Sequence, residues 1–317
     1  MSAELAMSVA YTALRESAAW MDLSGRGKIR VTGDDRARLL HALCSQNVAG
    51  MKPGDGAYAF FLNAQGRILA DANIFCFEDS FLLDTEPETA RKLFEHIDRY
   101  IIADDVTLAD ETEMTATLAI EGPQAEQVLW QLGATPPQND YATAPWGDRI
   151  VAKVSSTGAL GYFVFAPSFE KGQLTAKFAG LAHANAEEAR IVRIENGRPR
   201  YGEEITDRYL VQETGEMRGV HFHKGCYLGQ EIVERVRSRG QVHRVLRRLE
   251  LDTSEVPIAG TKLTASGAGG ASAEAAEIAS AAYSPALNKV VALAYVRAPF
   301  AETGTVIDAG TYQARVA

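Results

Sequence analysis

The sequence predicts an α+β protein made of two ferredoxin-like subdomains followed by a small C-terminal β-barrel. Residues up to 112 have the order strand, helix, strand, strand, helix, strand, which is typical of a ferredoxin-like unit. A similar order starts again near residue 115. After residue 243 the pattern changes to short strands separated by turns, which favours a small barrel or sandwich. We therefore expect three units, over 1–112, 113–242 and 243–317.

The first unit combines apolar helical stripes with short β-rich runs. We expect helices over 5–20, 32–43 and 85–101, and strands over 28–31, 57–62, 67–77, 81–83 and 106–108. Asn63-Ala64-Gln65-Gly66 joins two of these strands as a hairpin turn. Thr85 followed by Glu88, with Pro87 in the first turn, matches a capping box at the start of the last helix.

The second unit repeats this architecture without a detectable sequence repeat. We expect strands over 115–120, 150–154 and 160–165, a helix over 122–132 and a loop over 133–148. Ser168 is expected to cap a helix through Leu181, and Asn185 with Glu188 to cap another through Ile194. The barrel strands are expected over 245–251, 262–264, 276–283, 290–296, 305–307 and 312–316, with a small-residue linker over 265–275.

Composition favours a globular protein of a reducing compartment. The 317 residues are 46% hydrophobic and 23% charged, and 32 Lys and Arg against 41 Asp and Glu give a net charge of −9. An acidic chain binds polyanions poorly, so we expect no direct nucleic-acid partner. Cys44, Cys76 and Cys226 are widely separated and odd in number, which disfavours a disulfide framework. Without a leader pattern or a long apolar run, we expect a cytoplasmic protein with no membrane partner.

The segment 224–231 is dense in reactive and turn-forming groups. Cys226 is a candidate reactive thiol, because Lys224 or the N-terminus of a following helix would lower its pKa. Gly225 and Gly229 allow a sharp turn around it. The alternative is an inert, buried cysteine on a tight turn. No protease signature surrounds Cys226, which disfavours a hydrolase.

A metal site at this segment is a weaker alternative. His221, His223 and Cys226 have ligand types that suit zinc or iron, and two alternating histidines share a face of an extended segment. No fourth ligand is evident, because Cys44 and Cys76 are remote in sequence. We therefore expect no stable metal site.

Two further groups of charged residues need partners. Arginines are concentrated in one stretch, at positions Arg235, Arg237, Arg239, Arg244, Arg247 and Arg248. They could hold carboxylates or phosphates, or form a solvated face. Glu195 lies in the apolar part of a predicted helix and Asp71 in an apolar strand, where an unpaired acid is costly. Arg193 or a ligand could pair with Glu195.

Three motifs resemble a known family. The sequence KGCYLGQE at 224–231 resembles the signature of the YgfZ branch of the GcvT-like, folate-binding family. LNAQGRILAD at 62–71 is similar to the family's hairpin motif. RIENG at 193–197, with Pro199, Tyr201 and Gly202, is similar to a third segment. The resemblance covers most of the chain.

The resemblance implies three packed domains around a central channel that binds tetrahydrofolate or a derivative. It also implies a role in assembly or repair of iron–sulfur clusters, with iron–sulfur proteins or assembly factors as partners. An effect on tRNA modification would follow indirectly, through cluster-dependent enzymes. On this interpretation the protein is an accessory factor rather than a conventional enzyme.

The resemblance also suggests roles for individual residues. Glu195 would accept paired hydrogen bonds from the pterin, and Asp71 occupies the other acidic position. Arg235 or Arg237 would hold the glutamate tail. Tyr100 and Tyr201 are flat partners for the rings.

One departure bears on a second hypothesis, a folate-dependent aminomethyltransferase-like one-carbon transferase. Aminomethyltransferases of this scaffold carry paired aspartates after the hairpin, whereas this chain has Ala70-Asp71. They also lack the cysteine of KGCYLGQE. A third hypothesis is an interaction module whose arginine run docks an acidic partner or RNA.

Overall fold

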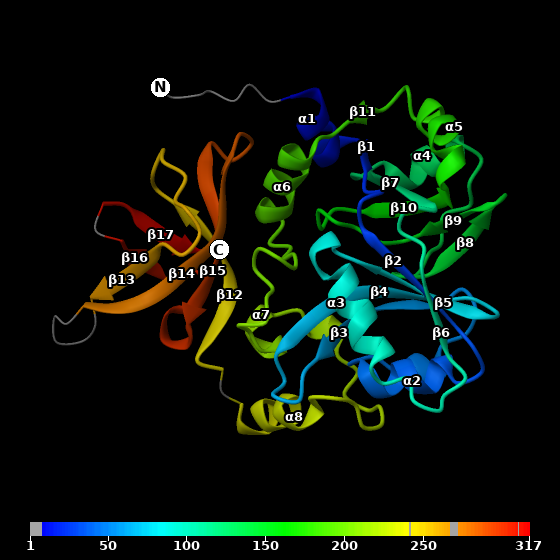
Figure 1. The fold of residues 1–317 in the computed structure, drawn as a ribbon. Coiled ribbons are helices and arrows are strands. Elements are labelled where there is room, and N and C mark those ends of the chain that lie inside the picture. The colour runs from blue at the N-terminus through cyan, green and yellow to red at the C-terminus, as the bar shows by residue number, and fades with distance from the viewer. Residues whose placement is uncertain (1–7, 241, 267–271, 310) are drawn as a thin grey trace.

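The computed structural model describes residues 8–240, 242–266, 272–309 and 311–317. It contains two α+β sheets side by side and a separate β-barrel (Figure 1). Helices α1 (Val9–Glu16) and α6 (Ala186–Glu195) lie between the barrel and the second sheet. The predicted α+β class with a C-terminal barrel is confirmed.

The first sheet is antiparallel, with the strand order β3-β4-β5-β2-β6. Its strands are β2 (Gly27–Thr32), β3 (Gly56–Leu62), β4 (Ile68–Cys76), β5 (Ser80–Thr85) and β6 (Thr107–Asp110). Helices α2 (Arg36–Leu43) and α3 (Pro87–Asp98) supply Leu40, Leu43, Leu93 and Ile97 to a core on one face of this sheet. On the opposite face, Phe60, Leu62 and Ile68 pack against the segment 201–233, and Asp71 lines a cavity.

The second sheet has the order β11-β1-β7-β10-β9-β8. Its strands are β1 (Ala19–Asp22), β7 (Thr115–Glu121), β8 (Thr143–Trp146), β9 (Arg149–Ala152), β10 (Gly161–Pro167) and β11 (Ala182–His183). Helices α4 (Ala125–Gln131) and α5 (Lys171–Lys177) pack on one face, and α1 and α6 pack on the other.

The chain between the second sheet and the barrel is mostly loop and short helix. It contains α7 (Val211–Thr214), the 3₁₀ turn η3 (Met217–Gly219) and α8 (Gln230–Arg239). The helix after Cys226 is therefore confirmed, and it forms the lower edge of the molecule in Figure 1. Further 3₁₀ turns are η1 (Val48–Gly50), η2 (Ser168–Glu170) and η4 (Ala298–Phe300).

The barrel has the strand order β13-β14-β15-β12-β17-β16, and β13 also contacts β16. Its strands are β12 (Arg244–Leu251), β13 (Lys262–Ser266), β14 (Ser272–Ser284), β15 (Lys289–Arg297), β16 (Val306–Asp308) and β17 (Gln313–Val316). The predicted linker 265–275 is wrong at both ends, because β13 and β14 pair as far as Ser266 and Ser272. Its middle, 267–271, lies outside the described residues.

The N-terminal helix is shorter than predicted. Helix α1 ends at Glu16, and the chain turns at Ser17 into β1, which pairs with β7 and β11. Pairing buries Ala19 and Met21, so sheet contacts determine a structure that local helical spacing does not reveal. Residues 5–7 of the predicted helix lie outside the described residues. The boundaries 1–112, 113–242 and 243–317 stay predictions, although β1 falls in the first range and pairs with the second sheet.

Three local predictions are wrong. Thr85 does not cap α3, since its hydroxyl donates to the Asp71 carbonyl oxygen instead. Ser168 begins the 3₁₀ turn η2 and is not a cap of α5. The predicted loop 133–148 contains strand β8, which pairs with β9. By contrast, the predicted capping box of Asn185 and Glu188 is confirmed.

None of the helices within the described ranges is long and apolar enough to span a membrane.

Candidate functional site

A cavity of about 380 Å³ lies between the first sheet, the 155–157 loop and α6. Its lining includes five arginines, Arg26, Arg190, Arg193, Arg198 and Arg200. It also includes four carboxylates, Asp22, Asp71, Glu86 and Glu203. Each of the five arginines has an ion-pair partner, which holds its guanidinium group in place. The volume lies within the range of small-molecule sites.

Asp71 reaches this cavity because side chains alternate along β4. Ala70 points into the core of the first sheet, so Asp71 points to the opposite face. The Tyr58 hydroxyl donates to Asp71 Oδ2 at 2.6 Å. Burial raises the pKa of Asp71 to about 6, and the hydrogen bond from Tyr58 opposes that rise. Asp71 can therefore gain or lose a proton near neutral pH.

Glu86 lies near Asp71 but has the opposite electrostatic environment. Arg26 pairs with Glu86, and Arg200 Nε lies 3.1 Å from Glu86 Oε2. Although burial opposes it, these arginines lower the pKa of Glu86. Two neighbouring carboxyls whose pKa values move apart are typical of a site that separates proton transfer from charge stabilisation.

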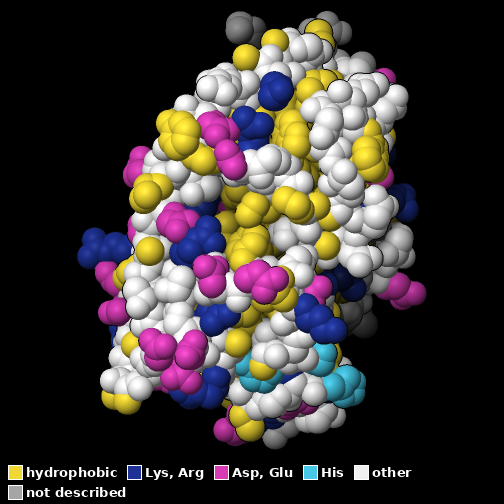
Figure 2. All heavy atoms as spheres, turned by 90° about the vertical axis from the view of Figure 1, so that its right-hand side faces the viewer, with side chains coloured by type: hydrophobic (Ala, Val, Ile, Leu, Met, Phe, Trp, Pro, Cys, Tyr) yellow, Lys and Arg dark blue, Asp and Glu magenta, His cyan; other side chains and the backbone are white. Residues whose placement is uncertain are grey.

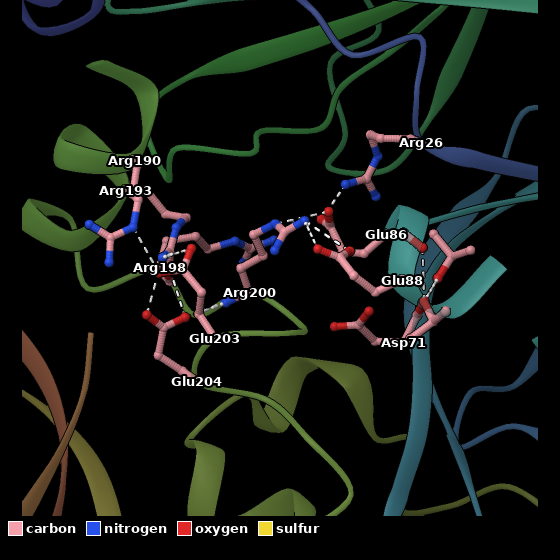
Figure 3. Close-up of polar contacts among 12 residues, drawn as sticks. Arg26, Asp71, Glu86, Glu88, Arg190, Arg193, Arg198, Arg200, Glu203 and Glu204 are labelled. Atoms are coloured by element: carbon pink, nitrogen blue, oxygen red, sulfur yellow. Dashed lines mark hydrogen bonds and ion pairs between the residues drawn. The ribbon is translucent and has the colours of Figure 1, made fainter. Parts of the chain in front are cut away.

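The opposite wall is an arginine frame on α6. Arg190 and Arg193 are three residues apart, so they lie on one helix face. Arg193 Nη1 donates to Glu204 Oε2 at 2.7 Å, and Arg190 Nε donates to Glu203 Oε2 at 2.8 Å. Figure 3 shows this frame across the cavity from Asp71 and Glu86. The arginines are thereby held in place before any ligand binds.

The third wall is the 155–157 loop, which is shaped by the buried carboxylate of Glu121. Glu121 accepts hydrogen bonds from the hydroxyl groups of Ser155, Ser156 and Thr157 and from the backbone N–H groups of Ser156 and Thr157. All five donors are neutral, and Glu121 has no exposed surface. A carboxylate that accepts several such bonds imposes one conformation on the loop.

Replacing Glu121 with glutamine is expected to loosen this wall. One carboxylate oxygen becomes an NH₂ group, which faces donors and leaves buried groups unsatisfied. We expect the free energy of unfolding to fall by about 1–3 kcal/mol, measured by urea denaturation. A Glu255→Gln variant, at an exposed position after β12, is the control, with an expected change within about 0.5 kcal/mol. Equal effects of the two variants would contradict the assigned role of Glu121.

Two of the residues predicted for the site, Asp71 and Tyr201, line the cavity. The Tyr201 hydroxyl lies 3.5 Å from the Ile68 carbonyl oxygen and 3.5 Å from Lys92 Nζ. Arg200, its neighbour in sequence, lines the same cavity.

Glu195 is not part of the cavity wall. The Tyr11 hydroxyl donates to Glu195 Oε1 at 2.5 Å, and Arg15 pairs with Glu195 Oε2. The expected partner, Arg193, pairs with Glu203 and Glu204 instead. The prediction that Glu195 has a partner is therefore confirmed, but the partner residues lie on α1. The pterin contact expected of Glu195 is not supported by this geometry.

Tyr100, Arg235 and Arg237 also lie outside the lining of this cavity. Tyr100 follows the end of α3 and packs edge-on against His96. Arg235 and Arg237 are on α8, where they pair with Glu231 and Glu234. Their expected contact with a folate tail in this cavity is not supported.

Cys226 is exposed and does not line the cavity. Lys224 turns away from the solvent, because its Nζ donates to the carbonyl oxygens of His41 and Cys44. Burial lowers the pKa of Lys224 to about 8. The ammonium is therefore used to hold the 224–229 loop against α2.

Histidines gather near the same loop, at the lower edge of the face in Figure 2. The rings of His221 and His223 have centroids 6.4 Å apart. Within the described ranges, His, Cys, Asp and Glu side chains form no group of three or more suited to a metal ion.

Sequence reasoning missed most of the arginines of the cavity. Arg190 stands three residues before Arg193 on a helix with a recognised cap, a spacing that would have indicated a shared face. Arg26 and Tyr58 carried no such signal, because tertiary packing alone brings them to the cavity.

Comparisons with known proteins agree with this architecture. A family model described as "GCVT N-terminal domain" matches residues 3–224, and one described as "Glycine cleavage T-protein C-terminal barrel domain" matches residues 244–317. The chain belongs to the glycine cleavage T-protein family. Members of this family bind tetrahydrofolate.

Several relatives of this family are similar over most of the chain. An aminomethyltransferase of Rubrobacter xylanophilus is 29% identical, over 90% of this chain and 78% of the relative. One of Streptomyces coelicolor is 29% identical, over 93% and 82%. The crystal structure of glycine cleavage system aminomethyltransferase T from Bartonella henselae covers 98% of this chain and 88% of that chain, with a TM-score of 0.86 at 20% identity. The similarity to this crystal structure shows that the two proteins share a fold.

Proposed function

We propose that this protein binds a reduced folate in the cavity between Asp71 and the arginine frame. One observation carries the proposal: a buried carboxyl with a pKa of about 6 faces Arg190 and Arg193 across one cavity. A folate has a hydrogen-bonding ring at one end and carboxylates at the other. The cavity offers complementary groups for both ends.

The chemistry of the lining fits this ligand. The carboxylate of Asp71 accepts hydrogen bonds from the amino and ring N–H groups of a pterin. The rings of Tyr58, Tyr201 and Phe163 supply apolar surface in the same cavity. Guanidinium groups of the arginine frame hold carboxylates in forked geometry. Membership of the family supports the same ligand.

When bound, a reduced folate supplies a carrier for a one-carbon unit. The residues of this chain would bind and orient it. Asp71 would hold or release a proton at its carboxyl, because its pKa is close to neutral pH. Glu86, ionised between Arg26 and Arg200, would stabilise nearby positive charge.

Calorimetric titration with tetrahydrofolate tests the proposal. We expect saturable binding with one site per chain. Heat that does not saturate, for any reduced folate tested, would contradict it. A Glu195→Gln variant tests the alternative ring position suggested by the resemblance. A loss of binding in that variant, with none in an Asp71 variant, would place the ring against α6.

We further propose that the chain belongs to the YgfZ branch and serves as an accessory protein in iron–sulfur cluster assembly or repair. The motif KGCYLGQE and the exposure of its thiol, Cys226, support this role. The partners would be iron–sulfur proteins or assembly factors, and tRNA modification would be affected indirectly. The exposed loop would meet these partners away from the folate cavity.

Replacing Cys226 with serine is expected to abolish restoration of cluster-dependent enzyme activity in a deletion strain. Binding of tetrahydrofolate should stay within about twofold, because Cys226 does not line the cavity. A Cys76→Ala variant, which removes a buried thiol elsewhere, is the control. Full restoration by Cys226→Ser would contradict the accessory role of the thiol.

Aminomethyl transfer is the second candidate, favoured by the names of the relatives. It predicts formation of methylenetetrahydrofolate from an aminomethyl donor. The single acid Asp71 disfavours it, because Ala70 faces the core of the first sheet. Product formation that depends on Asp71 but not on Cys226 would favour transfer over the accessory role.

A further inference from the structure

A second cavity of about 190 Å³ adjoins the folate cavity. Ser155 and Arg198 line both cavities, so they form a shared wall. The second cavity exceeds the roughly 150 Å³ of an engineered cavity that binds benzene. It therefore has room for a group of several heavy atoms. The proposed contacts of the pterin ring do not use it.

This cavity carries more positive than negative charge. Lys153, Arg198 and Arg218 line it, together with one acid, Asp140. Glu216 pairs with both arginines, at 3.3 Å to Arg198 Nη1 and 2.6 Å to Arg218 Nε. Lys153 Nζ lies 3.5 Å from Asp140, whose side chain is 81% exposed. Each of the three cations thus has a carboxylate partner, and the five groups together carry a net charge of +1.

The wall of the cavity has a fixed shape. Tyr141 has φ +65°, a left-handed conformation that is unusual for a bulky residue. Its backbone N–H donates to the Lys153 carbonyl oxygen at 2.9 Å, which holds it there. Gly158 has φ +81°, and a Cβ at this position would lie 3.2 Å from Arg198 Cβ. The backbone therefore packs tightly against Arg198 and positions its guanidinium.

We propose that this second cavity is a carboxylate subsite in which Lys153, Arg198 and Arg218 bind one carboxylate group. The carboxylate could belong to the glutamate tail of a folate in the first cavity, a source that rests on the proposed function. It could also belong to a separate small carboxylic acid. A single excess positive charge matches a monoanion, and guanidinium groups suit the planar carboxylate.

The proposed subsite lies next to the residues that surround Asp71. The guanidinium carbons of Arg198 and Arg218 lie 5.8 Å and 5.1 Å from the centroid of the Tyr58 ring. The Tyr58 hydroxyl donates to Asp71. Burial raises the pKa of Asp71, and the charge of Arg198 opposes that rise. An anion beside Arg198 is therefore expected to raise the pKa of Asp71 further.

The test compares ligands with and without the glutamate tail. Tetrahydrofolate, tetrahydropteroate, which lacks the glutamate, and free L-glutamate are each titrated into the full chain by calorimetry. The variant is Lys153→Gln, because Lys153 lines the second cavity and not the first. Lys289→Gln, which removes an ion-paired lysine from the barrel, is the charge-matched control.

Either of two results supports the carboxylate subsite and shows which molecule supplies the carboxylate. If the tail binds there, tetrahydrofolate binds about 10- to 100-fold more tightly than tetrahydropteroate, and Lys153→Gln reduces that difference. If a separate acid binds there, L-glutamate saturates the wild-type chain, and Lys153→Gln weakens its binding about 10- to 100-fold. Lys289→Gln changes neither.

The proposal is overturned if both pterins bind equally and L-glutamate does not saturate. The folate proposal survives that result, because tetrahydropteroate still binds. If neither pterin binds, the folate proposal fails. Saturable binding of L-glutamate then still supports the subsite, and its absence overturns it. An effect of Lys289→Gln equal to that of Lys153→Gln would also overturn the subsite, since it would reflect net charge.

Discussion

Replacing Asp71 with asparagine is expected to weaken tetrahydrofolate binding about 10- to 100-fold at pH 7.5. The substitution removes the charge that strengthens hydrogen bonds from the pterin, and it keeps the size of the side chain. Calorimetry measures the dissociation constant. An Asp79→Asn variant, on the exposed turn before β5, is the control. A dissociation constant unchanged within twofold would contradict the assigned role of Asp71.

The same substitution is expected to stabilise the fold slightly or leave it unchanged. The folded-state pKa of Asp71, about 6, exceeds its ordinary value of 3.8. The folded state therefore binds more protons than the unfolded state between these values, and stability contributed by Asp71 falls as pH rises through this window. Above pH 6, the asparagine variant no longer has the free-energy cost of ionising a buried carboxyl. Weaker binding without weaker folding would separate a ligand role from a structural one.

Replacing Glu204 with glutamine is expected to lower the free energy of unfolding by about 3–5 kcal/mol. Glu204 has no exposed surface and pairs with Arg193, whose side chain is also buried. It also accepts a hydrogen bond from Ser280 of the barrel, and its carbonyl oxygen accepts one from Tyr295 at 2.7 Å. Removing the charge leaves a buried guanidinium without its main counterion.

Urea denaturation, followed by circular dichroism, measures this loss. The control is Glu277→Gln, because Glu277 pairs with a half-exposed Arg208 and is expected to contribute less than about 1 kcal/mol. We also expect Glu204→Gln to weaken folate binding, since Arg193 would lose one of its two carboxylate partners and keep only Glu203. If Glu204→Gln lowers the free energy of unfolding no more than Glu277→Gln does, the buried network around Glu204 does not stabilise the protein.

Local sequence signals predicted much of the fold. The Asn63–Gly66 turn forms as expected, because the Asn63 side chain accepts from the Arg67 N–H and Gly66 adopts φ +70°. The Asn185 cap likewise depends on residues within one turn. These interactions are complete within a few residues, so the sequence is enough to recognise them.

The site was less predictable because its partners are distant in sequence. Glu195 is paired by Arg15, 180 residues away, and Thr85 bonds to Asp71 instead of capping its own helix. The arginines that matter, Arg193 and Arg198, were less conspicuous than the run that begins at Arg235. Arg235 and Arg237, the first two of that run, pair with Glu231 and Glu234 on their own helix.

The pH dependence of tetrahydrofolate binding tests the central claim most directly. Asp71 must be ionised to accept the pterin, and its pKa is about 6. The dissociation constant of the wild-type chain should therefore rise about tenfold between pH 7.5 and pH 5. Asp71→Asn, measured in parallel, corrects for titration of the ligand itself and should lack this additional rise. An identical pH profile for the two proteins would contradict the account.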